Sequence, residues 1–111
     1  MRKYTTPTLV VRIDGKNLEE CDVYVTLGQG NRRLTYTNDD FESVEADACG
    51  VTAKILLTQE QTASFSMSQE VSIQANVIDK TGHRAATDIM QVGMMRNLLE
   101  EVIEYEGQTE P

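Results

Sequence analysis

Residues 51–57 read Val51-Thr52-Ala53-Lys54-Ile55-Leu56-Leu57, and residues 71–77 read Val71-Ser72-Ile73-Gln74-Ala75-Asn76-Val77. In both stretches every second residue is apolar, and most of the residues between them are polar. A β-strand directs alternate side chains to opposite faces, so a period of two predicts a strand with one face in a core. The two stretches therefore predict two half-buried strands that share one core.

The same alternation predicts five further strands, over residues 8–13, 23–27, 34–37, 41–48 and 84–94. In the last of these the apolar phase shifts, which predicts a β-bulge near Ile89. About seven short strands separated by turns are typical of an antiparallel β-sandwich, and no strand alternates with a helix. The fold class is therefore all-β, with a predicted core stripe of Val11, Val25, Ile55, Ile73 and Val77.

Two connections have specific turn chemistry. Thr58 and Gln61 have the spacing of a helix capping box. We therefore expect one helical turn over Gln59–Ala63, crossing from one sheet to the other. Asp79-Lys80-Thr81-Gly82 predicts a hairpin loop in which Gly82 takes a left-handed conformation.

The end of the chain changes period. Leu98, Leu99, Val102 and Ile103 recur at helical spacing after Asn97, a good N-cap residue. This predicts a short C-terminal helix, with an extended segment as the alternative. The expected organisation is an N-terminal arm over residues 1–7, a single sandwich domain over residues 8–106, and a disordered tail over residues 107–111.

Composition excludes several classes of function. The chain has 111 residues, which fits one domain, and a formal net charge of -8, which repels phosphate backbones. No apolar run approaches the roughly 18 residues of a membrane span, and Tyr4-Thr5-Thr6-Pro7 stands where a signal peptide would be apolar. We expect a cytosolic protein that binds neither nucleic acid nor membrane. Cys21 and Cys49 are too far apart in sequence for a metal or redox motif, and are interpreted as half-buried apolar residues.

The candidates for chemistry each have a simpler interpretation. His83 is the only histidine, and it flanks a turn, so we expect it to be solvated. The acidic turn Asn38–Glu42 lacks the spacing of an EF-hand, and Gly28-Gln29-Gly30 is too short for a dinucleotide-binding motif and suits a hairpin turn. Met90, Met94 and Met95 fit either an adaptable contact surface or core filling. We therefore predict no enzyme activity, no catalytic or cofactor-binding residues, and no metal site.

Several short segments of the sequence resemble those of a known family. Leu57-Thr58 to Thr62, then Ile73-Gln74, then Asp79–Gly82 are similar to a succession of strand ends and turns in small structural proteins of phages and prophages of Gram-positive bacteria. The early turn Asp14-Gly15-Lys16-Asn17-Leu18 is similar to one in the N-terminal domain of phage baseplate upper proteins. The resemblance covers residues 8–95. It implies an immunoglobulin-like β-sandwich, no enzymatic activity, and a place in a virion tail or baseplate.

The first functional hypothesis is therefore a structural or adaptor module of a phage or prophage tail or baseplate, located in the virion and assembled in the host bacterial cytoplasm. Its partners would be other virion or tail proteins, with homo-oligomers possible, and the first strand, Thr8–Ile13, is the expected docking edge. The alternative is a carbohydrate-binding or adhesive module. Sandwiches bind sugars through exposed aromatic residues, and we expect Tyr24 and Tyr36 to be able to share an outer face.

Overall fold

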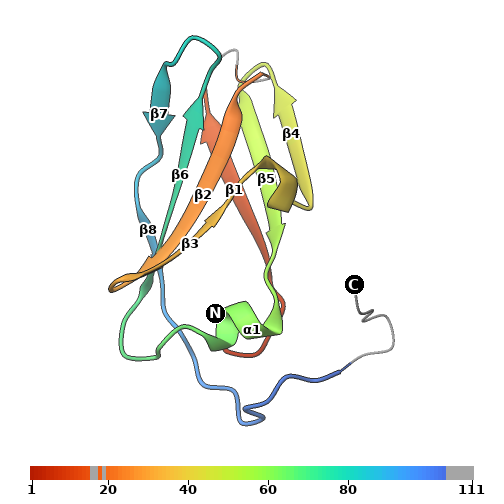
Figure 1. Cartoon of the computed structure of the whole chain (residues 1–111), viewed down its shortest axis with the longest axis vertical. Coiled ribbons are helices and arrows are strands. Elements are labelled where there is room, and N and C mark those ends of the chain that lie inside the picture. Colours follow the sequence, from red (N-terminus) through yellow and green to blue (C-terminus); the bar gives the residue numbers. More distant parts are fainter. Residues whose placement is uncertain (16–17, 19, 105–111) are drawn as a thin grey trace.

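The computed structural model describes residues 1–15, 18 and 20–104 (Figure 1). The described residues form eight strands and two short helical turns, so the chain is all-β, as predicted. The strands are β1 (Thr8–Asp14), β2 (Asp22–Gln29), β3 (Arg32–Tyr36), β4 (Ser43–Asp47), β5 (Gly50–Leu56), β6 (Val71–Ile78), β7 (Arg84–Ala86) and β8 (Met90–Val92). The helical turns are η1 (Asn38–Asp40) and α1 (Gln59–Ala63).

The strands form two antiparallel sheets (Figure 1). The smaller sheet has the order β1-β5-β4, so β5 is central and β1 lies at an edge. In the larger sheet β3, β2 and β6 are neighbours, and β7 and β8 both pair with the far side of β6. The passage from β5 in the smaller sheet to β6 in the larger sheet takes place through α1, as the sequence predicted.

The core is built from the inward residues of the central strands, and the predicted alternation is confirmed on β2, β5 and β6. Of the predicted core stripe, four residues are buried and Val11 is half-buried, because β1 has a neighbour on one side only. The buried apolar residues form one cluster: Ile13, Val23, Val25, Leu27, Tyr36, Val51, Ala53, Ile55, Leu57, Phe65, Val71, Ile73, Ala75, Val77 and Met94.

The helical turn α1 has the predicted capping box. The Thr58 hydroxyl accepts a hydrogen bond from the Gln61 N–H at 3.1 Å, and the Gln61 side chain accepts one from the Thr58 N–H at 2.9 Å. α1 also fastens the N-terminal residues, because the fully buried Thr62 hydroxyl bonds both the N–H and the C=O of Thr5, at 3.0 and 2.9 Å.

The predicted bulge explains why there are eight strands and not about seven. Ala86 pairs with Asn76 and Met90 pairs with Ile73, so residues 87–89 face only two residues of β6. This extra residue splits the return strand into β7 and β8. The Thr87 hydroxyl accepts the Ala75 N–H at 3.0 Å, which satisfies a backbone donor at the break.

The predicted C-terminal helix is wrong for the described residues, which include none beyond α1. A helix of this length is marginal in water unless packing supports it. Here the Gln59 amide instead holds the backbone of Ile103, donating to its C=O at 2.9 Å and accepting its N–H at 2.7 Å. Leu98 is 90% exposed, so its side chain adds little packing. The predicted tail, residues 107–111, lies outside the described residues.

The close approach of β1 to β5 generates the first prediction. Gly50 pairs with Asp14, and a Cβ at Gly50 would collide with the carbonyl oxygen of Ile13 and lie 3.0 Å from the Asp14 Cα. Because both neighbours are backbone atoms, a side chain fits only if β1 moves away. We expect Gly50→Ala to lower the free energy of unfolding by about 1–3 kcal/mol in urea titrations.

Gly93→Ala is the matched control. A Cβ there would meet nothing within 4 Å, so its effect should stay within about 0.5 kcal/mol. Equal urea midpoints for the two variants would show that β1 does not pack against Gly50 this tightly.

Candidate functional site

The open edge of β1 is the first surface feature with functional potential. Pro7 C=O accepts the Leu57 N–H at 3.0 Å, and the Gly15 N–H donates to Cys49 C=O at 2.9 Å. These two bonds lie at either end of the β1–β5 ladder and share its register. Hydrogen-bonded and non-hydrogen-bonded residue pairs alternate along an antiparallel ladder. The backbone N–H and C=O groups of the odd-numbered residues of β1 therefore bond β5.

The even-numbered residues of β1 therefore direct their backbone groups away from β5. These residues are Thr8, Val10, Arg12 and Asp14. Within the described part of the chain, no strand pairs with β1 on that side. The edge thus presents a row of N–H and C=O groups to which a further strand can bond.

The charges of β1 are directed across the sheet and not along its edge. The Arg12 guanidinium bonds both carboxylate oxygens of Asp47 on β4 at 3.1 Å, and donates to Asp14 at 3.2 Å. The bonds to Asp47 are the main reason that the pKa of Arg12 is raised, and the bond from Arg12 is the main reason that the pKa of Asp47 is lowered. Arg12, the only charge on the predicted strand, thus leaves the edge open. β1 is one residue longer than predicted and also includes Asp14.

The other edge strands are better protected against unwanted pairing. β4 carries Glu45, β3 begins with Arg32 and Arg33, and the bulge interrupts the β7–β8 side. Charges and bulges are common ways in which sheets prevent edge-to-edge association. β1 is therefore the edge most suited to docking.

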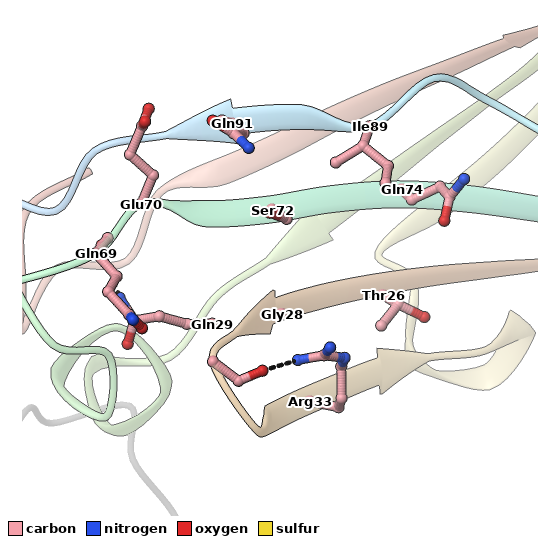
Figure 2. Close-up of a pocket in the computed structure, with 11 residues that line it drawn as sticks. Thr26, Gly28, Gln29, Arg33, Gln69, Glu70, Ser72, Gln74, Ile89 and Gln91 are labelled. Atoms are coloured by element: carbon pink, nitrogen blue, oxygen red, sulfur yellow. Dashed lines mark hydrogen bonds between the residues drawn. The ribbon is translucent and has the colours of Figure 1, made fainter.

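A polar groove on the outer face of the larger sheet is the second feature (Figure 2). It has a volume of about 590 Å³ and is lined by residues of β2, β3, β6 and β8 and of the loops beside them. The lining residues are Thr26, Gly28, Gln29, Gly30, Arg33, Gln69, Glu70, Ser72, Gln74, Ile89 and Gln91. The groove is rich in amides and hydroxyls, and its only charged side chains are those of Arg33 and Glu70.

Part of this polar lining is occupied by structural hydrogen bonds. Arg33 donates to the Gly30 carbonyl at 2.6 Å, the bond drawn in Figure 2, and Gln74 donates to the Thr87 carbonyl at 3.0 Å. Gln29 is buried, and its amide bonds the backbone of Ser66 and Gln69. The local sequence indicates only a turn at Gln29, because this role depends on a loop that begins 37 residues further along the chain.

The two tyrosines proposed as a sugar-binding pair lie on opposite faces, so that prediction is wrong. Tyr36 is paired with Val25, and both side chains are buried in the core. Tyr24, next to Val25 on β2, points outward and is 38% exposed. Burial is the main reason that the pKa of Tyr36 is raised.

The acidic turn and His83 both contact neighbouring residues of the fold. In the turn, Asn38 accepts the Val23 N–H at 3.0 Å and donates to Asp22 at 2.8 Å, which fixes η1 against β2. His83 is exposed, as predicted, and its ring lies 3.4 Å from the Asp79 carboxylate and 2.8 Å from the Thr81 hydroxyl. No three His, Cys, Asp or Glu side chains of the described residues are grouped closely enough to hold a metal ion.

The methionines and cysteines singled out in the sequence differ in how far they are buried. Met94 is in the core, which fits the predicted core filling, while Met90 and Met95 are exposed and do not fill the core. Cys21 is half-buried as predicted, but Cys49 is exposed, because it lies in the turn between β4 and β5. Gly30 has a φ of 57° in the β2–β3 hairpin, which confirms the predicted turn.

Comparison with known proteins adds no relative: no family model, curated protein or solved structure matches the chain. No helix in the described ranges is long and apolar enough to cross a membrane. The edge of β1 and the groove are therefore the two structural features from which we infer a function.

The hairpin loop after β6 generates a prediction on pH. Asp79 accepts hydrogen bonds from the Thr81 hydroxyl at 2.7 Å and from the N–H groups of Thr81 and His83 at 2.9 Å. These bonds, with the hydroxyl first, lower the pKa of Asp79 from 3.8 to about 2. Because the folded-state pKa is the lower one, this stabilisation is present above pH of about 4 and is lost as the pH falls towards 2.

Carbon-detected NMR titration should place the pKa of Asp79 near 2, and in Thr81→Val the pKa should rise towards the ordinary value. Lys80→Ala is the control, since no hydrogen bond joins Lys80 to Asp79 in the described hairpin. An Asp79 that titrates near 3.8 in all three proteins would contradict this loop geometry.

Proposed function

We propose that this chain is a non-enzymatic contact module of a phage or prophage virion, in the tail or baseplate, with an immunoglobulin-like sandwich. It docks on other subunits by adding a strand to the open edge of β1. The observation that carries the proposal is the row of backbone groups on Thr8, Val10, Arg12 and Asp14, which face away from β5.

Strand addition suits this edge energetically. Each backbone hydrogen bond to an incoming strand contributes about 0.5–1.5 kcal/mol net, and several form together along one register. The Arg12 side chain is already held by Asp47, so an incoming strand need not displace a solvated charge from the edge. Val10 is exposed and gives the incoming strand an apolar contact.

The virion assignment is supported by the resemblance of the segments around α1 and the Asp79–Gly82 hairpin. In the structure the first of these is the capped turn between the sheets, and the second is the β6–β7 loop. Both determine how consecutive strands connect. Similar connections in the phage proteins are consistent with the proposed sandwich.

A second candidate function, saccharide binding, is favoured by the groove. Ser72, Gln91 and Glu70 line it, and none of these side chains has a hydrogen-bond partner within the described part of the chain. Neutral amides and hydroxyls suit the hydroxyl groups of a sugar. A glycan-array signal abolished by Gln91→Ala and kept in Val10→Pro would favour this function over edge docking.

The edge proposal is tested by Val10→Pro. Proline lacks the N–H that Val10 directs to the open side, while no β1–β5 hydrogen bond is lost. We expect at least about tenfold weaker binding to the products of genes flanking the one for this chain, equivalent to about 1.4 kcal/mol. Biolayer interferometry measures this, and thermal melting checks that the variant is folded.

Thr35→Pro on β3 is the matched control. Gln29 and Arg32 flank the two-residue turn of the β2–β3 hairpin and form its hydrogen-bonded pair. Alternation then directs the N–H of Thr35 to the open side of β3. Binding should persist in this variant. Equal binding by Val10→Pro, Thr35→Pro and the unchanged protein would exclude docking through β1.

A further inference from the structure

We infer that, when no other subunit occupies the open edge of β1, it binds β1 of a second copy of this chain, paired antiparallel about a two-fold axis at Val11. This inference rests on the proposed edge docking and adds a second occupant of the same edge, with its register. In such an interface the same patch is used twice, so it must be complementary to itself.

The backbone restricts the possible registers. Only even-numbered residues of β1 have open N–H and C=O groups, so each hydrogen-bonded pair must join two of them. An axis at Arg12 would place Arg12 opposite Arg12, and like charges directly opposite each other are destabilising. An axis at Val10 would leave Asp14 opposite a residue outside β1.

An axis at Val11 uses the whole edge. Thr8 then faces Asp14 of the second copy, and Val10 faces Arg12 of the second copy. All four even-numbered residues pair, so every open backbone group of the strand gains a partner. The outcome is one continuous sheet with the order β4-β5-β1-β1-β5-β4, in which the least protected edge of each copy is covered.

The side chains agree with this register. On the inner face it places Val11 opposite Val11 and Leu9 opposite Ile13, so apolar residues meet only apolar residues. Leu9 and Val11 are half-buried and already pack on the core cluster, and a neighbouring strand would cover their open side. On the outer face, the exposed Val10 meets the aliphatic part of Arg12.

The charges of β1 do not oppose this contact. The chain has a net charge of -8, but β1 contains one cation, Arg12, and one anion, Asp14, and is neutral. The two copies therefore meet through strands that carry no net charge. The remaining charges still repel over longer distances, so the dimer fraction should rise as salt screens them.

Cross-linking tests both partner and register. In the inferred dimer the two Val11 residues form a non-hydrogen-bonded pair, whose Cα atoms lie about 4.5 Å apart, within the range that a disulfide spans. In a Cys21→Ser, Cys49→Ser background, Val11→Cys should form a covalent dimer under mild oxidation. Leu9→Cys is the control, since it faces Ile13 and not itself, and it should stay monomeric on non-reducing gels.

Sedimentation of the unchanged full chain, across protein concentration and at 0.05–1 M salt, should show a dimer that increases with both and is lost in Val10→Pro. A monomer throughout, or a Leu9→Cys cross-link as efficient as that of Val11→Cys, would overturn the inference. So would a dimer that persists in Val10→Pro. Each of these results would contradict the dimer alone. The proposed docking of other subunits would still hold if Val10→Pro weakens binding to the flanking gene products at least about tenfold.

Discussion

The packing of the inner face of β5 against β2 and β6 is the interaction on which the rest of the structure depends. Val51, Ala53 and Ile55 are at most 1% exposed, and full burial of an aliphatic side chain such as valine or isoleucine contributes about 1.5–3 kcal/mol. Among the strands of the described residues, only β5 joins β1 and β4 to the molecule by sheet hydrogen bonds. Its position therefore fixes the edge that carries the proposed function.

The edge of β1 follows from this arrangement and from one glycine. Gly50 lets the end of β1 lie close to β5, where a side chain would meet the Ile13 carbonyl. The same end of the sheet holds the Arg12–Asp47 pair, which connects β1 to β4 across β5. The strand is thus held firmly on one side, while its other side keeps its backbone groups available.

Long-range polar contacts complete the fold at places where strand pairing ends. Gln29 holds the loop after α1, Thr62 holds Thr5, and Gln59 holds Ile103. In each case a side chain satisfies backbone groups that no strand or helix satisfies. These partners lie from 37 to 57 residues apart in sequence, so no local pattern could have predicted them.

The sequence by itself determined the strands, the capped turn α1, the bulge and the inward faces of β2, β5 and β6, because these follow from local periodicity and turn chemistry. The sequence also predicted the first strand as the docking edge, and only the tertiary structure decided which of its residues direct their backbone groups to the open side. Only the tertiary structure decided that Tyr36 points inward while Tyr24 points outward, and which polar side chains line the groove. It also overrode the helical spacing of residues 98–103, since a short helix without packing is marginal. Faces and edges depend on which strands become neighbours, and that is a property of the whole chain.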